Sequence, residues 1–257
     1  MKVRMRFSKS GTMKFIGHLD VMRYFQKAFR RAGLDMLYSQ GYSPHPLLSF
    51  AQPLGIGLTS DGEYLDLQLA SSGASAEMIA RINEVMMPEM QIESFVRLPD
   101  ESKTSMALVA AADYRIARKD GYETENIEGL SEQLASFLSR QEIRVVKKTK
   151  KGESELDLRP FLYQAAVTAE DGGSWQGQTW VSRPSRAEEY ENGQVLYLRL
   201  AAGSEVNIKP ELVMETFLQT LGQSYQPFAW QIHRLELYAR KKEEEFIALE
   251  QLGEELL

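Results

Sequence analysis

The stretch YSQGYSPHPLLSFAQPLGIGLTSDGE, residues 38–63, interrupts the periodic pattern of the first part of the chain. It holds three of the nine prolines and one of the three histidines. Gly and Pro at this density disfavour a helix, and the stretch is too long for a hairpin turn. Long ordered loops in compact domains commonly carry binding surfaces. We therefore expect this loop to mark a working surface, and the periodic segments around it to make the fold.

The residues before this loop predict a strand followed by a helix. Residues 2–7 alternate basic and apolar side chains, which is typical of a strand with one buried and one basic face. From residue 18 to 32 the period becomes helical. The expected apolar stripe is Met22, Phe25, Phe29 and Ala32, and the opposite side carries Arg23, Lys27, Arg30 and Arg31.

The whole chain predicts two tandem units of the same element order. Around the loop we expect strands at residues 36–39, 47–51, 62–70 and 90–98 and a helix at residues 74–87. The polar residues 99–105 predict a boundary, giving an amino-terminal domain of residues 1–101 and a carboxy-terminal domain of residues 102–257. The second half predicts strands at residues 106–118, 142–148, 162–168, 195–201 and 230–238, helices at 130–139 and 210–221, and a charged helix at 240–257. The expected fold is α+β, with two tandem ferredoxin-like (split βαβ) domains and a C-terminal helix.

Composition narrows the classes of function. The chain has no cysteine, so it holds no disulfide, thiolate zinc site or iron–sulfur cluster. No apolar run is long enough to span a membrane, and we expect a cytoplasmic protein without membrane contact. The net charge is −6, but residues 1–50 carry nine Lys or Arg against two Asp, or +7, leaving −13 for the rest. This asymmetry suggests a polyanionic partner.

Histidines are the candidates for proton transfer. His18 begins the basic helix, and His45 lies between Pro44 and Pro46, which restrict its backbone. We expect His233, in a strand, to be a satisfied core or rim residue. The three histidines lack metal-ligand spacing, so the sequence predicts no metal site. It also predicts no cofactor, because phosphate loops, dinucleotide fingerprints and the hydrolase nucleophile motif are missing.

Basic and aromatic residues favour a single-stranded RNA surface. Residues 144–151 place five cations on an expected hairpin, and with the first helix they would hold a phosphate backbone. Aromatic side chains in the loop would stack on unpaired bases. The alternative is that Tyr38 and Phe50 are core residues and the hairpin is solvated. The candidate ligand residues are Arg4, Arg6, Lys9, Arg23, Lys27, Arg31, Tyr38, Tyr42, His45, Phe50, Lys147, Lys148 and Arg159.

The runs RFSKSGTMKFIGHLDVMRYFQKAFRRAGL, YSQGYSPHPLLSFAQPLGIG, GEYLDLQL and KKTKKGESELDLRPFL resemble the bacterial radical-SAM-linked domain family. That family occurs alone or fused behind a radical-SAM module. This chain has no CxxxCxxC motif, so radical chemistry would come from an enzyme in trans. It has Tyr42-Ser43 where the family pattern has Phe-Asn. The positions that match are Arg6, Phe7, His18, Asp20, Arg23, Arg31, Tyr38, Ser39, Gly41, Pro44, His45, Pro46, Ser49, Phe50, Asp157 and Arg159.

Three functions follow as expectations. The first is a radical-SAM-associated accessory protein, a non-catalytic module that binds tRNA- or rRNA-type RNA through the basic helix and the SPHP loop. The second is a metal-independent endoribonuclease, similar in architecture to the CRISPR repeat-processing nucleases, in which His18 or His45 transfers the proton and Lys9 or Arg6 steadies the phosphate. The third is a protein–protein adaptor for a radical-SAM enzyme that docks through the C-terminal helix.

Overall fold

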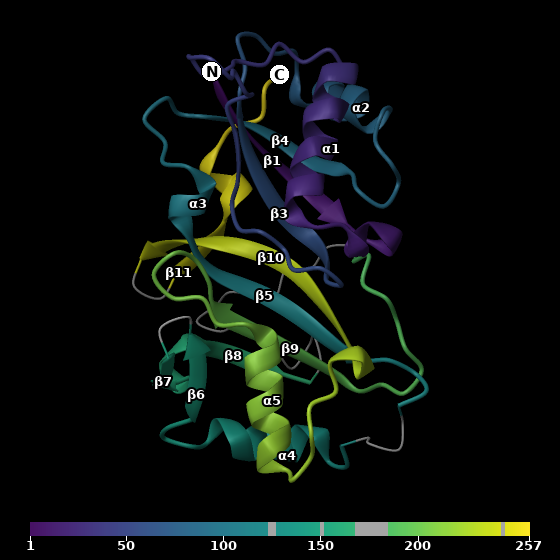
Figure 1. The fold of residues 1–257 in the computed structure, drawn as a ribbon, viewed down its shortest axis with the longest axis vertical. Coiled ribbons are helices and arrows are strands. Elements are labelled where there is room, and N and C mark those ends of the chain that lie inside the picture. Colours follow the sequence, from purple (N-terminus) through teal and green to yellow (C-terminus); the bar gives the residue numbers. More distant parts are fainter. Residues whose placement is uncertain (123–126, 150–151, 168–184, 243–244) are drawn as a thin grey trace.

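Nine strands join in one mixed sheet in the computed structural model, which describes residues 1–122, 127–149, 152–167, 185–242 and 245–257 (Figure 1). The order is β4-β1-β3-β10-β5-β9-β8, with β2 on β3 and β11 on β10. The chain is therefore α+β, as expected. Tandem ferredoxin-like domains are not evident as separate bodies, because β10 from the end of the chain pairs with both β3 and β5.

The amino-terminal elements follow the expected order. β1 and β3 pair along most of their length, and α1 and α2 cover the face that carries Val3, Met5, Leu65 and Leu67. The expected strand at residues 36–39 reduces to single bridges at Met36 and Tyr38. The elements are β1 (Lys2–Lys9), η1 (Gly11–Phe15), α1 (His18–Arg31), β2 (Leu48–Phe50), β3 (Thr59–Gln68), α2 (Ser75–Asn83) and β4 (Ile92–Leu98).

The carboxy-terminal elements also appear in the expected order, with one addition. A single helical turn, α3 (Ser105–Leu108), precedes β5 and replaces the start of the expected strand. β6 and β7 form a separate two-stranded sheet. The elements are β5 (Val109–Arg118), α4 (Leu130–Leu138), β6 (Arg144–Thr149), β7 (Gly152–Asp157), η3 (Arg159–Phe161), β8 (Leu162–Ala166), β9 (Val195–Ala201), α5 (Pro210–Thr220), η4 (Pro227–Ala229) and β10 (Trp230–Lys242).

The expected C-terminal helix at residues 240–257 is wrong. β10 continues to Lys242, and the chain then forms β11 (Glu245–Ala248) and the short η5 (Leu249–Leu252). The final residues return to the amino-terminal half, where the Leu256 backbone N–H donates to Ser75 Oγ at 2.8 Å. Because this segment is part of the body, it offers no separate docking helix for an adaptor.

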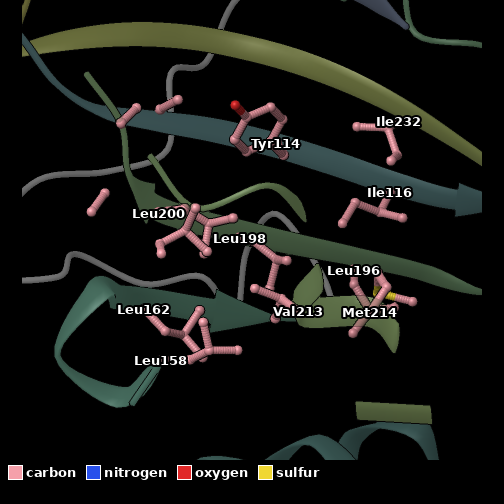
Figure 2. Close-up of a cluster of buried hydrophobic side chains, with 14 of the residues drawn as sticks. Tyr114, Ile116, Leu158, Leu162, Leu196, Leu198, Leu200, Val213, Met214 and Ile232 are labelled. Atoms are coloured by element: carbon pink, nitrogen blue, oxygen red, sulfur yellow. The ribbon is translucent and has the colours of Figure 1, made fainter. Parts of the chain in front are cut away.

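Two hydrophobic clusters lie under the helices. One contains residues of the first 95 positions, and the other draws mainly on residues 109–249. Figure 2 shows the second cluster, in which Leu196, Leu198 and Leu200 of β9 lie near Val213 and Met214 of α5. The division near residue 102 remains a prediction. Among the described residues, no helix has both the length and the apolar character needed to cross a membrane.

Candidate nucleic-acid interface

Arg4, Arg6 and Lys9 of β1 are buried and only Lys2 at its start is half-buried, so most of the expected basic face does not reach solvent. Arg4 is fully buried and donates to Asp66 at 2.8 Å and to the Leu249 carbonyl at 3.1 Å. Arg6 pairs with Glu236 at 3.2 Å. The expectation that these two arginines contact RNA does not fit their positions, because both guanidinium groups are buried and already paired within the protein. Exposure of either would leave a buried carboxylate without its partner.

Glu236 forms the centre of this buried charged cluster. Its carboxylate accepts a hydrogen bond from Tyr64 Oη at 2.6 Å, besides the pair with Arg6. Burial raises the pKa of Glu236 to about 7, although the Arg6 charge and the Tyr64 hydrogen bond act to lower it. The carboxyl group therefore titrates near neutral pH.

Lys9 and His18 line one small hollow on the α1 face of the sheet. Phe50, Gln52 and Glu63 line it as well, and its volume is about 20 Å³, enough for one water molecule. Lys9 is 2% exposed, and its ammonium group donates to the Ile16 carbonyl at 3.1 Å. Burial lowers the pKa of Lys9, while the Glu63 charge acts to raise it. This geometry brings together the two groups expected for ribonuclease chemistry, but a scissile phosphate does not fit the space.

The outer face of α1 is exposed, as its pattern predicts. Lys27, Arg30 and Arg31 all face solvent, and none has a carboxylate partner among the described residues. Arg23 pairs with Asp20 at 3.1 Å in an exposed i, i+3 contact, which contributes at most about 1 kcal/mol. The last turn also suits cations because the helix dipole is negative there. These three cations therefore form a positive surface that no carboxylate of the described residues neutralises by an ion pair.

The loop that contains His45 projects from the edge of β3, at the end of the molecule where β1 begins. Its base is held by the bridge between Tyr38 and Pro46 and by the Ser39 backbone N–H, which donates to the His45 carbonyl at 2.9 Å. Ser39 Oγ also lies 2.9 Å from His45 Nδ1. β1 runs away from this end and α1 runs back towards it, so the α1 C-terminus lies at the same end as the amino terminus (Figure 1).

His45 and the α1 cations do not share a hollow. His45 borders a cavity of about 230 Å³ that is also lined by Lys2, Asp66 and Lys103. No α1 residue lines it. Lys2 and Asp66 alternate with the core residues of their strands, which places this hollow on the sheet face opposite α1. The chain that follows α1 carries the His45 loop and then enters β2, so this loop connects the α1 end to the strands beside the hollow.

The other candidates divide between surface and core. Tyr42 is fully exposed and Tyr38 is 40% exposed, whereas Phe50 is buried against Phe7 and Phe25 and does not fit a base-stacking role. Lys147 and Lys148 lie on β6 opposite Ser154 and Glu153 in register. Arg159 is half-buried at the start of η3. Lys150 and Lys151 lie outside the described residues.

His233 is a core residue, as expected. Its ring lies 2.8 Å from both Thr59 Oγ1 and Asp61 Oδ2. Asp61 in turn accepts hydrogen bonds from Ser185 Oγ and the Arg186 backbone N–H. Burial would raise the pKa of Asp61, but the hydrogen bonds and charge of His233 and the contacts of residues 185–186 lower it.

The sequence did not indicate that Lys2 and Lys103 line the hollow beside His45, because nothing in the local sequence shows that a linker folds beside a strand.

A comparison with models of known protein families identifies the family of this chain. A family model described as "Uncharacterized protein conserved in bacteria (DUF2344)" matches residues 2–210. The chain belongs to the DUF2344 family. The match includes both the α1 surface and the residues that line the His45 hollow. A search of curated proteins finds no match.

Proposed function

We propose that this DUF2344 protein binds single-stranded RNA through the outer face of α1 and the loop that follows it. The observation that carries the proposal is the group of exposed cations Lys27, Arg30 and Arg31, which lack carboxylate partners among the described residues. Cations of this kind bind phosphates and release counterions, which gives affinity without sequence specificity.

The aromatic residues of the loop support RNA over a folded acidic protein. Tyr38 and Tyr42 are exposed in the loop that follows α1, and each ring can stack on an unpaired base. The duplex form of RNA buries its bases, so this combination favours single strands or loops. Following the resemblance to radical-SAM-linked proteins, we further propose that the bound RNA is presented to a radical-SAM enzyme supplied in trans.

We also propose that each half of the chain has the split βαβ architecture. It is supported by the strand orders β4-β1-β3-β2 and β10-β5-β9-β8, each antiparallel between neighbours. Such sheets occur in RNA-binding modules, but fold alone does not fix function. The assignment of the RNA surface therefore depends on the exposed side chains.

The test is a titration of labelled single-stranded RNA of mixed sequence at several salt concentrations. We expect Lys27→Gln with Arg31→Gln to weaken binding and to reduce the slope of log K on log salt by about 1.4, or about 0.7 per lost cation. Arg140→Gln with Lys209→Gln is the control, because both residues are exposed cations of the other half. An unchanged slope in the α1 variant, or no binding by the wild type, would contradict the proposal.

Cleavage is the second candidate, favoured by the shared hollow of Lys9, His18 and Glu63. If the loop at residues 52–57 moves to admit a phosphate, His18 is placed to transfer a proton and Lys9 to steady the charge. We expect cleavage of the same RNA in the presence of a chelator to fall about 100-fold in His18→Gln while binding persists. An RNA that stays intact with the wild type at every pH would eliminate this candidate.

A further inference from the structure

The hollow beside His45 has both apolar and polar lining. Pro46, Leu47 and Leu98 contribute apolar lining, here called the apolar wall, and Lys2, Lys103 and Thr104 contribute polar lining. Its volume of about 230 Å³ is below the roughly 300–1,000 Å³ of typical small-molecule sites. The space therefore suits a group the size of one base rather than a dinucleotide cofactor.

The charge of this hollow favours an anion. Lys2 Nζ donates to the carbonyl oxygens of Asp100 at 2.6 Å and Ser102 at 3.3 Å, which leaves its positive charge without a carboxylate. Lys103 is exposed and has no ion pair among the described residues. The lining carboxylate, Asp66, is already paired with Arg4 and accepts the Ser105 backbone N–H at 2.6 Å. The exposed acids Asp100 and Glu101 lie in the adjacent linker and do not line the hollow.

His45 places an imidazole ring at the mouth of the hollow. Ser39 Oγ accepts the His45 backbone N–H at 3.2 Å and lies 2.9 Å from Nδ1. The Ser43 carbonyl oxygen lies 3.4 Å from the same Nδ1. These contacts orient the ring through Nδ1, and Nε2 makes no hydrogen bond to a described residue. Nε2 is therefore available to a polar group of a nucleotide, as donor or acceptor according to the tautomer.

We propose that this hollow receives one unstacked nucleotide of the bound RNA, with its base against the apolar wall and its phosphate beside Lys2 and Lys103. This inference rests on the proposed RNA binding and names the nucleotide site within it. The loop that carries Tyr42 and His45 connects the α1 surface to the hollow around the end of the sheet. One strand of RNA then contacts both surfaces, and the hollow holds the base that leaves the stack.

Filling the hollow provides the direct test. Thr104 lines it, is exposed, and makes no side-chain capping hydrogen bond at the start of α3. We expect Thr104→Trp to lower RNA affinity about fivefold or more, the loss typical of one stacked base, without changing the salt slope. Met106→Trp is the matched control, because Met106 is exposed on the adjacent α3 turn and does not line the hollow, and it should bind like the wild type. A titration with a nucleoside monophosphate should show saturable binding that Thr104→Trp abolishes.

A crosslinking measurement on the wild-type protein covers the case in which Thr104→Trp fails to fold. Photoactivatable 4-thiouridine RNA should crosslink to peptides that contain residues 44–49 or 98–104. Crosslinks confined to α1, or full RNA affinity in a folded Thr104→Trp protein, would overturn the nucleotide site and leave the α1 proposal standing. If the wild-type protein binds no RNA, both the α1 proposal and the nucleotide site are overturned.

Discussion

The basic residues near the amino end are either buried or exposed, depending on the element that carries each one. On β1, Arg6 points into a buried layer where it pairs with Glu236, and its side chain is 5% exposed. On α1, Lys27 and Arg31 stay in solvent because the opposite stripe, which includes Phe25 and Phe29, packs on the sheet. Basic residues therefore stabilise the fold on β1, whereas those on α1 are available to bind a ligand. A count of charges along the sequence does not distinguish the buried cations from the exposed ones.

Glu236 gives stability a specific pH dependence. Its pKa in the fold is raised from 4.5 to about 7, so between these values the folded protein holds a proton that the unfolded chain has released. Stability should therefore fall as pH rises from about 5 to about 7. Relative to Glu236→Gln, we expect the wild type to lose on the order of 1–3 kcal/mol between pH 5 and pH 8 in urea denaturation.

The control for this pH dependence is Glu84→Gln, which changes an exposed glutamate at the end of α2. It should keep the wild-type pH profile. If Glu236→Gln and the wild type show parallel stability curves across this range, the carboxyl group titrates at an ordinary value and the buried cluster is charged throughout.

At the scale of elements, the close approach of β3 and β10 joins the two halves of the sheet. The strands run parallel there and share two register pairs, His233 with Thr59 and Arg234 with Ser60. At this point Gly62 faces the β10 backbone, where an added Cβ would lie 2.5 Å from the Leu235 carbonyl oxygen. The two nearest atoms, the Leu235 carbonyl oxygen and the Glu236 Cα, belong to the β10 backbone and cannot move aside as a flexible side chain would.

We expect Gly62→Ala to destabilise the fold by about 1–3 kcal/mol or more, because the methyl group forces the strands apart. Gly55→Ala is the matched control, since its Cβ would lie 3.6 Å from a flexible Leu58 side chain. That control should be neutral or slightly stabilising, through lower entropy of the unfolded chain. Urea denaturation of both variants measures the contrast, and equal stabilities would show that β3 and β10 are not tightly joined here.

At the scale of the whole molecule, long-range ion pairs cross between the halves. Arg6 pairs with Glu236, Glu63 with Arg234, and Lys14 with Glu188. The first two pairs are buried, so each half leaves charges uncompensated without the other. Loss of one partner of a buried pair typically costs about 3–5 kcal/mol.

We therefore expect residues 1–101 to remain unfolded when produced alone, although they contain their own hydrophobic cluster. Circular dichroism and amide NMR spectra should show little native structure in this fragment. Mixing or co-expression with residues 102–257 should restore the native structure, which would show that the fragment is able to fold when its partner is present. Well-dispersed spectra from the isolated fragment would mean that the boundary near residue 102 separates an independent domain.

The sequence by itself determined the local elements, because hydrophobic periodicity depends on neighbouring residues. The helix at residues 18–31 and the loop around His45 could be predicted for this reason. The strand in place of the terminal helix could not, because pairing with β10 outweighs the helical preference of its charged residues. Only the tertiary structure decided which cations are free. The partners of Arg4 and Arg6 lie 62 and 230 residues away along the chain, and only folding brings them together.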